Sequence, residues 1–160
     1  MWFMMSMALA GEPQVAFRDD GLLHGTVEVA ASADAVRAVL DDAVRMARWS
    51  PDVIAYEAVG EPAGGCQVYA AKTKGMWKPL TYTSKRCRTT EGYRDNLVES
   101  DSFQVMTGEW TLTPVESGTR IDFVGDLELS LPVPKRLLSG ARVKGLTLTL
   151  TKLGEAVSTP

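Results

Sequence analysis

Few residues in this chain have side chains of the kinds that most often do chemistry. There is one histidine, His24, and there are two cysteines, Cys66 and Cys87. Nucleophilic catalysis of the Ser-His-Asp or Cys-His kind needs its histidine at the site. His24 alternates with the apolar Leu23 and Val27, which places it on the solvent side of a strand. Because one histidine and two cysteines also fall short of a zinc ligand set, we expect no catalytic residue of these classes and no metal site.

Carboxylates are numerous, and one that is buried in an apolar pocket would indicate function. Asp122, Asp126 and Glu128 alternate with apolar residues, so we expect them in solvent. Three further acids lie in strands whose phase the pattern leaves open, so that one of them could face inward: Glu57, Glu99 and Asp101. The glycine-rich stretch 60–65 lacks the Lys-Ser/Thr pair of a phosphate loop. We therefore expect no cofactor.

Aromatic residues carry a more useful signal. Tyr56, Tyr69 and Tyr82 lie in the expected middle strands, and Trp49 stands where a helix should meet the sheet. A tyrosine inside a cavity offers apolar surface and one hydrogen-bonding group that can orient a ligand. The alternative, which the pattern leaves open, is ordinary packing in a core or on an exposed strand face.

The elements that must position these side chains are mostly strands. The chain has 160 residues, of which 45% are hydrophobic, enough for one domain with a sizeable core. Residues 15–29 predict a short strand, a turn and a longer strand, and Ser32 is an expected N-cap for a helix. A second short helix should end at Ser50-Pro51. From residue 53 to 131, turn signals recur about every ten residues, which predicts an antiparallel meander.

The segment 108–123 predicts a hairpin whose register can be read from its apolar residues. Antiparallel pairing sets Trp110 opposite Phe123, and Leu112 opposite Ile121. Two glycines, Gly108 and Gly125, then share that face and should let the sheet bend or leave room above it. The pattern does not decide whether this face covers a solid core or a hollow.

The last 28 residues carry two competing patterns. "GLTLTLTKL" alternates with a period of two, which is typical of a strand, whereas leucines spaced from Leu138 to Leu153 follow helical spacing. We expect one long helix, because the helical spacing extends over nearly the whole segment. A sheet of this length must curl around a single helix to bury it. The predicted fold is therefore α+β, with a curved antiparallel sheet of about six to seven strands and a pocket beneath the helix.

The two cysteines can be placed in this scheme. A hairpin centred on residues 76 and 77 pairs positions whose numbers add to 153, which sets Cys66 directly opposite Cys87. Residues so opposed are close enough for a disulfide bond, and a disulfide would suit an exported protein. The alternative is a pair of buried, reduced thiols.

Residues 1–10 are a short apolar run that ends in Ala-Leu-Ala, which resembles a signal-peptidase site. A basic start is missing, so an unstructured Met-rich start, or a start codon assigned too far downstream, remains an alternative. The pattern favours export to the periplasm over a cytoplasmic location. No apolar run reaches the roughly 20 residues of a membrane-spanning helix, and a net charge of −3 without a basic stripe excludes nucleic acid as a partner class.

Four segments together resemble a known family: "VEVAASADAVRAVLDD", "RWSPDV", "GEWTLTPVESGTRIDF" and "LPVPKRLLSGARVKGLTLTLTKLGEAV". Their order and spacing resemble the START-like, Bet v 1-type helix-grip superfamily (SRPBCC), in its polyketide cyclase/dehydrase and lipid-transport or coenzyme-Q-binding branch. The resemblance implies a single START-like domain over residues 11–160 and a helix at its C-terminus. It also implies a deep apolar cavity for a lipid, a sterol, an isoprenoid or quinone, or a polyketide-like molecule.

Binding or transport of such a hydrophobic ligand, without covalent chemistry, is the expected function. The alternative is an enzyme of the cyclase, aromatase or dehydratase type that uses the same cavity, and a third reading is a protein-interaction module. The family has no universal catalytic motif, so the resemblance carries over the fold and not the chemistry. The oligomeric state is left open. We expect nine residues to line the cavity: Trp49, Tyr56, Tyr69, Tyr82, Met106, Trp110, Phe123, Leu138 and Leu146.

Overall fold

A computed structural model describes residues 11–75 and 77–158. The expected leader, residues 1–10, lies outside the described residues. Along the described chain the elements are β1 (Gln14–Phe17), β2 (Leu23–Val29), α1 (Ala33–Leu40), α2 (Ala43–Trp49), β3 (Val53–Ala63), β4 (Cys66–Thr73), β5 (Leu80–Arg88), β6 (Gly92–Glu99), β7 (Phe103–Val115), β8 (Gly118–Leu129) and α3 (Lys135–Ser158).

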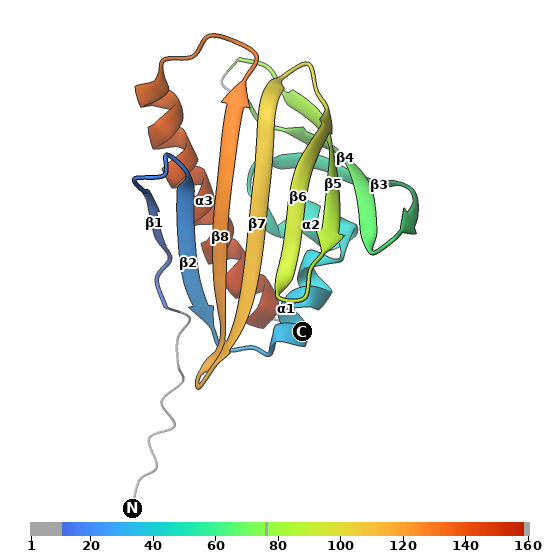
Figure 1. Cartoon of the computed structure of the whole chain (residues 1–160), viewed down its shortest axis with the longest axis vertical. Coiled ribbons are helices and arrows are strands. Elements are labelled where there is room, and N and C mark those ends of the chain that lie inside the picture. Colours follow the sequence, from blue (N-terminus) through green and yellow to red (C-terminus); the bar gives the residue numbers. More distant parts are fainter. Residues whose placement is uncertain (1–10, 76, 159–160) are drawn as a thin grey trace, which may run out of the picture.

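The strands form one antiparallel sheet in the order β1-β2-β8-β7-β6-β5-β4-β3 (Figure 1). The expected α+β fold is confirmed, including the two short helices after the first long strand. The sheet has eight strands rather than six to seven. The short strand expected before the turn in residues 15–29 is β1, which pairs with β2 at one edge of the sheet.

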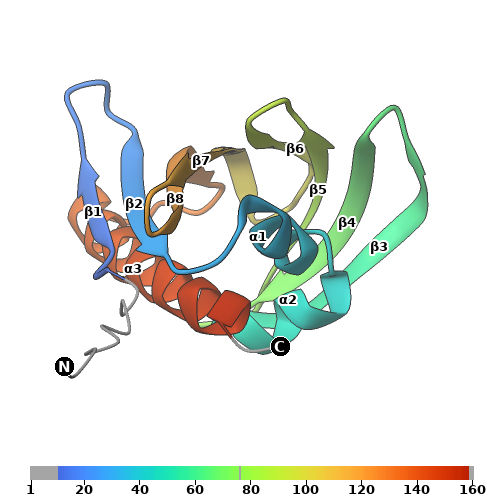
Figure 2. The ribbon, with the colours of Figure 1, turned by 90° about the horizontal axis from the view of Figure 1, so that it is seen from below.

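The sheet curves strongly, and the helices lie on its concave side (Figure 2). The segment 135–158 is one helix, α3, as the helical spacing predicted, and it passes across the open side of the curve. It approaches β2 closely over Gly25, where an added Cβ would lie 2.8 Å from Cδ2 of Leu146 and 3.0 Å from Cδ1 of Leu150. Glycine at this position therefore lets helix and sheet come together.

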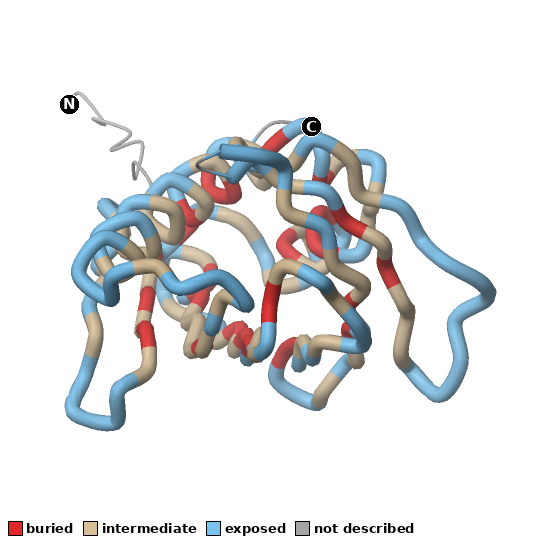
Figure 3. Tube along the Cα trace, turned by 90° about the horizontal axis from the view of Figure 1, so that it is seen from above, coloured by how far each residue is buried: buried red, intermediate tan, exposed pale blue. Residues whose placement is uncertain are grey.

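The β7–β8 hairpin has the predicted register. Trp110 pairs with Phe123, and Leu112 with Ile121. The rings of Trp110 and Phe123 meet edge to face, with their centroids 4.9 Å apart. Trp110, Leu112 and Ile121 are buried in the core together with Leu150 of α3. This part of the hairpin therefore covers a solid core, and the concave side of the sheet is where the buried residues gather (Figure 3).

The two glycines of this hairpin, Gly108 and Gly125, face each other as predicted. The room above them is filled, however. A Cβ on Gly125 would lie 2.6 Å from Cζ of Phe123, and one on Gly108 would lie 2.9 Å from its Cε2. The expectation that the glycines leave space is thus corrected, because the ring of Phe123 lies over both of them.

Helix α1 is joined to the far side of the sheet by polar side chains. Ser32 caps it by accepting a hydrogen bond from the backbone N–H of Ala35, as predicted. At its other end the carboxylate of Asp41 accepts a hydrogen bond from the hydroxyl of Tyr93 at 2.8 Å and pairs with Arg88 at 2.7 Å. These contacts fix the end of α1 beside β5 and β6.

Candidate functional site

A cavity of about 490 Å³ lies where the first half of α3 meets the sheet and the connection between β4 and β5. Most of its lining side chains are apolar: Leu80, Phe103, Met106, Leu127, Leu129, Leu131, Val133, Leu138 and Ala141. Trp77 also lines it and is 78% exposed, so the cavity opens to solvent beside this ring. The arrangement gives an apolar interior with a mouth at one end of the molecule.

Three of the nine residues expected at a cavity line this one, each from a different element: Tyr82 on β5, Met106 on β7 and Leu138 on α3. The structure places the other six in or against the core. Trp49, Tyr69 and Trp110 are buried, whereas Tyr56, Phe123 and Leu146 are half-buried. Tyr56 and Tyr69 stack on each other, with ring centroids 4.7 Å apart.

Tyr82 is the tyrosine among the lining residues of this cavity, and it also lines a second hollow on the neighbouring strands. Its ring meets Phe103 edge to face at 5.7 Å. Burial, with the negative charge of Asp95 acting in the same direction, raises the pKa of Tyr82 to about 12. At neutral pH its hydroxyl is therefore uncharged, and it can donate one hydrogen bond to a ligand oxygen or accept one from a ligand hydroxyl.

A buried ion pair lies further along the same strand, and the sequence reasoning did not find it. Tyr82, Ser84 and Arg86 face the concave side, because all three pair with concave residues of β4. The guanidinium of Arg86 donates to both carboxylate oxygens of Asp95, at 2.7 and 2.8 Å. It also donates to the backbone carbonyl of Leu40 at 3.2 Å. The signal that could have found it is the two-residue period, which puts Arg86 on the face of Tyr82.

This pair holds the core together, and each nitrogen of the Arg86 guanidinium has a hydrogen-bond partner within the fold. Burial opposes the charge of Arg86, but the attraction and the hydrogen bonds of Asp95 outweigh it and raise the pKa of that guanidinium. The indole N–H of Trp110 donates to the same carboxylate at 3.1 Å. Every partner in the network is thus satisfied within the fold, so its role is to join α1, β5, β6 and β7.

Charged residues surround the mouth of the cavity. Lys74 and Lys78, from the connection between β4 and β5, line it together with Arg142 of α3 and a single acid, Asp52. Arg142 is half-buried: its Nη2 donates to the carbonyl of Gly125 at 3.3 Å. Sequence reasoning did not single out these residues, because their meeting depends on how α3 crosses the sheet.

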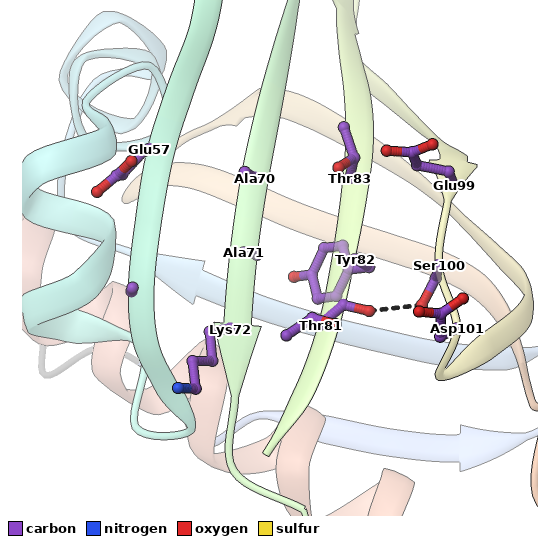
Figure 4. Close-up of a pocket in the computed structure, with 11 residues that line it drawn as sticks. Glu57, Ala70, Ala71, Lys72, Thr81, Tyr82, Thr83, Glu99, Ser100 and Asp101 are labelled. Carbon is purple, nitrogen blue, oxygen red and sulfur yellow. Dashed lines mark hydrogen bonds between the residues drawn. The ribbon is translucent and has the colours of Figure 1, made fainter.

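A second hollow, of about 560 Å³, lies across β3, β4 and β5 and is lined largely by polar side chains (Figure 4). The register sets Glu57, Ala70, Thr83 and Glu99 in one row across four strands, with an acid at each end. Glu57, Glu99 and Asp101, whose phase the sequence left open, are all exposed here. No metal-binding group of His, Cys, Asp and Glu occurs among residues 11–75 and 77–158. This open, polar hollow is a poorer site for a hydrophobic ligand.

The remaining chemistry-bearing residues lie away from the cavity. Cys66 and Cys87 are paired across β4 and β5 in the register the sequence predicted, and their sulfur atoms form a disulfide. The ring of His24 contacts the carboxylate of Asp20 at 2.8 Å, on the face of β2 opposite the buried residues. Among the helices described, none is long and apolar enough to cross a membrane.

Solved structures with the same architecture are numerous, although their sequences are distant. A START superfamily protein from Mycobacterium smegmatis superposes with a TM-score of 0.77 at 19% identity, over 86% of this chain and 97% of that one. A STAR-related lipid transfer protein from Xanthomonas axonopodis superposes with a TM-score of 0.72 at 19% sequence identity, over 93% of this chain and 100% of that one. The Zhui aromatase/cyclase from a Streptomyces species superposes with a TM-score of 0.71 at 22% sequence identity, over 84% of this chain and 92% of that one.

Identities of this size establish a shared fold and nothing about ligand or chemistry. No curated protein sequence is a significant match to this chain. The family model for polyketide cyclase/dehydrase and lipid transport, in contrast, matches residues 22–156, which include α1, α2, all but the last two residues of α3, and all strands except β1. The chain therefore belongs to the polyketide cyclase/dehydrase and lipid transport family, within the START-like helix-grip superfamily.

Proposed function

We propose that this protein binds and carries a hydrophobic small molecule in the cavity between the sheet and α3, without changing it covalently. The ligand classes are a lipid, an isoprenoid or quinone, a sterol, or a polyketide-like chain. The observation that carries the proposal is the apolar cavity of about 490 Å³, which falls within the usual size range of small-molecule sites.

The energetics of the cavity support an occupant. The cavity opens to solvent beside Trp77, so water fills it when no ligand is bound. Its apolar side chains, among them Leu80, Phe103 and Met106, offer that water few hydrogen-bonding partners. Covering apolar surface with an apolar ligand contributes about 25 cal/mol per Å² removed from water. A hydrophobic ligand fits these walls better than water does.

The alternative function is a cyclase, aromatase or dehydratase acting on a polyketide-like chain. The observation in its favour is Tyr82, a hydroxyl on the cavity wall that could polarise a ligand carbonyl. Its raised pKa of about 12 argues against a role as a general acid or base, since such groups work best with a pKa near the operating pH. The geometry therefore supports binding over catalysis.

Native mass spectrometry of the purified protein, followed by lipid extraction, tests the proposal. We expect a bound hydrophobic molecule, or a gain in mass when a fatty-acyl, prenyl or sterol probe is added. Ala141→Trp would fill the mouth of the cavity and should abolish this binding, because Ala141 lines the cavity and is otherwise exposed. Lys144→Trp, on an exposed position of the same helix that does not line the cavity, is the matched control.

Two results would contradict the proposal. One is a protein that carries no extractable lipid and binds none of the probes. The other is equal binding by the Ala141→Trp and Lys144→Trp variants, which would place the ligand elsewhere. Conversion of a poly-β-keto chain to a cyclised product with loss of water would establish the enzymatic alternative instead.

A further inference from the structure

Cations predominate at the mouth of the cavity. Lys74, Lys78 and Arg142 line it with one acid, Asp52, although the whole chain carries a net charge of −3. None of the three cations forms an ion pair with any carboxylate of the described chain. Other cations of this protein do pair, Arg86 with Asp95 and Arg88 with Asp41 among them. Positive charge therefore exceeds negative charge in the lining of this cavity, and none of its three cations is in an ion pair of the described chain.

Arg142 is the most informative member, because it is half-buried beside apolar walls. Its polar contacts in the fold are one hydrogen bond to the carbonyl of Gly125 and a stacking contact with the ring of Phe17 at 5.1 Å. One carbonyl satisfies only one of the five N–H donors of a guanidinium. Burial lowers the pKa of Arg142, and the negative charge of Asp126 only partly opposes this effect. A negative group beside Arg142 would supply the missing counter-ion.

We propose that Arg142, assisted by Lys74 and Lys78, binds the anionic head group of an amphiphile whose apolar chain occupies the cavity. This rests on the proposed function and narrows it from hydrophobic ligands in general to those that carry a carboxylate or phosphate at one end. The planar guanidinium can hold such a group through two parallel hydrogen bonds, and the lysines, which line the same cavity from the connection between β4 and β5, add positive charge. The apolar chain would then extend along Phe103, Met106 and Leu127.

Three probes with the same chain and different head groups test this inference: dodecanoate, dodecyl phosphate and dodecanol. Titration calorimetry of the wild type should show both anions binding at least about tenfold more tightly than the alcohol, because a hydrogen bond to a charged group contributes about that much. Arg142→Gln should remove this preference while leaving the affinity for dodecanol unchanged, and Arg142→Lys should keep part of it. Lys144→Gln removes an exposed positive charge from the same helix and should change nothing.

The outcomes separate the two proposals. If none of the three probes binds the wild type, the proposed function fails and the head-group site falls with it. If all three bind equally well, the cavity stands but the head-group site is refuted. Loss of dodecanol binding in Arg142→Gln would show that Arg142 shapes the cavity instead of reading the head group. Lys78→Gln changes an exposed residue and should not disturb folding. This variant must bind dodecanoate and dodecyl phosphate more weakly than the wild type does, and it must bind dodecanol equally well.

The two lysines could instead contact the phosphates of a membrane surface. Sedimentation with vesicles of phosphatidylglycerol and phosphatidylcholine separates the two sources of anion. If Lys74→Gln and Lys78→Gln lose vesicle binding but keep full affinity for monomeric dodecanoate, the assignment of these lysines to the ligand head group is overturned. Weaker dodecanoate binding in solution, without vesicles, supports it.

Discussion

Removing the carboxylate of Asp95 would leave Arg86 buried and without a counter-ion. In Asp95→Ala, the guanidinium loses two hydrogen bonds of 2.7 and 2.8 Å and keeps only its bond to the carbonyl of Leu40. The indole N–H of Trp110 loses its acceptor in the same step. Both groups are buried, whereas the side chain that they lose is 21% exposed, so water replaces the missing partner only in part.

The expected loss of stability is large. Breaking a buried ion pair by removing one partner costs about 3–5 kcal/mol. With a urea m-value of about 2 kcal/mol per M, a loss of about 4 kcal/mol lowers the unfolding midpoint by about 2 M. Far-UV circular dichroism during urea titration measures this shift. Because a domain is stable by only about 5–15 kcal/mol, the variant should remain folded but marginal.

The exposed pair of Arg94 and Glu109 is a matched control on neighbouring strands. Its charged atoms are 3.8 Å apart, and the two side chains are 59% and 58% exposed. Glu109→Gln should therefore change the free energy of unfolding by no more than about 1 kcal/mol. Burial therefore predicts that the loss of unfolding free energy is about 3 kcal/mol larger for Asp95→Ala than for Glu109→Gln.

The double variant Arg86→Met, Asp95→Leu decides whether the missing counter-ion causes the loss. Replacing both charges by apolar side chains of similar volume removes the unpaired ion, so the double variant should be more stable than Asp95→Ala. Two results would refute this explanation. One is a free energy of unfolding for Asp95→Ala within about 1 kcal/mol of the wild-type value. The other is a double variant that is less stable than both the wild type and Asp95→Ala.

Three further predictions concern stability. Burial raises the pKa of Tyr82 to about 12 in the folded protein, whereas the unfolded chain releases this proton near the ordinary tyrosine pKa of 10.0. Stability should therefore fall between these pH values, and Tyr82→Phe should reduce that fall in alkaline thermal melts. Gly140→Ala should stabilise α3 by up to about 1 kcal/mol, since its added Cβ meets nothing, whereas Gly125→Ala should cost about 1–3 kcal/mol; thermal melts that show no difference would contradict both. Thiol titration of the denatured, unreduced protein should find no free thiol, and Cys66→Ser with Cys87→Ser should cost about 3 kcal/mol for a loop of 21 residues.

Strand pairing was predictable because apolar alternation and turn position fix it locally. The register of Trp110 with Phe123, and of Cys66 with Cys87, follows from counting outward from a turn, and the structure has both. Residues 135–158 carried both a two-residue strand period and a helical spacing of leucines. The helical spacing extended over more of the segment, and the structure has a helix there. These features depend on neighbours along the chain or across one hairpin.

The candidate site was less predictable because it depends on contacts between elements far apart in the sequence. Arg86 and Asp95 each look like ordinary surface charges, and only the pairing of β5 with β6 reveals that they meet on the concave side. Lys78 and Arg142 are separated along the chain by four strands, and they line one cavity because α3 crosses the sheet at that end. No local pattern encodes that crossing.

The position of Phe123 bears on the shape of the cavity near Arg142. The cavity reaches the row of Met106 and Leu127, and the next paired row on the same face, Gly108 and Gly125, lies beneath the Phe123 ring. The carbonyl of Gly125 in that row accepts the hydrogen bond of Arg142, so the ring lies beside the proposed head-group site. A smaller residue at position 123 would therefore enlarge the space around the head group, and the room for the apolar chain along Phe103, Met106 and Leu127 would stay the same.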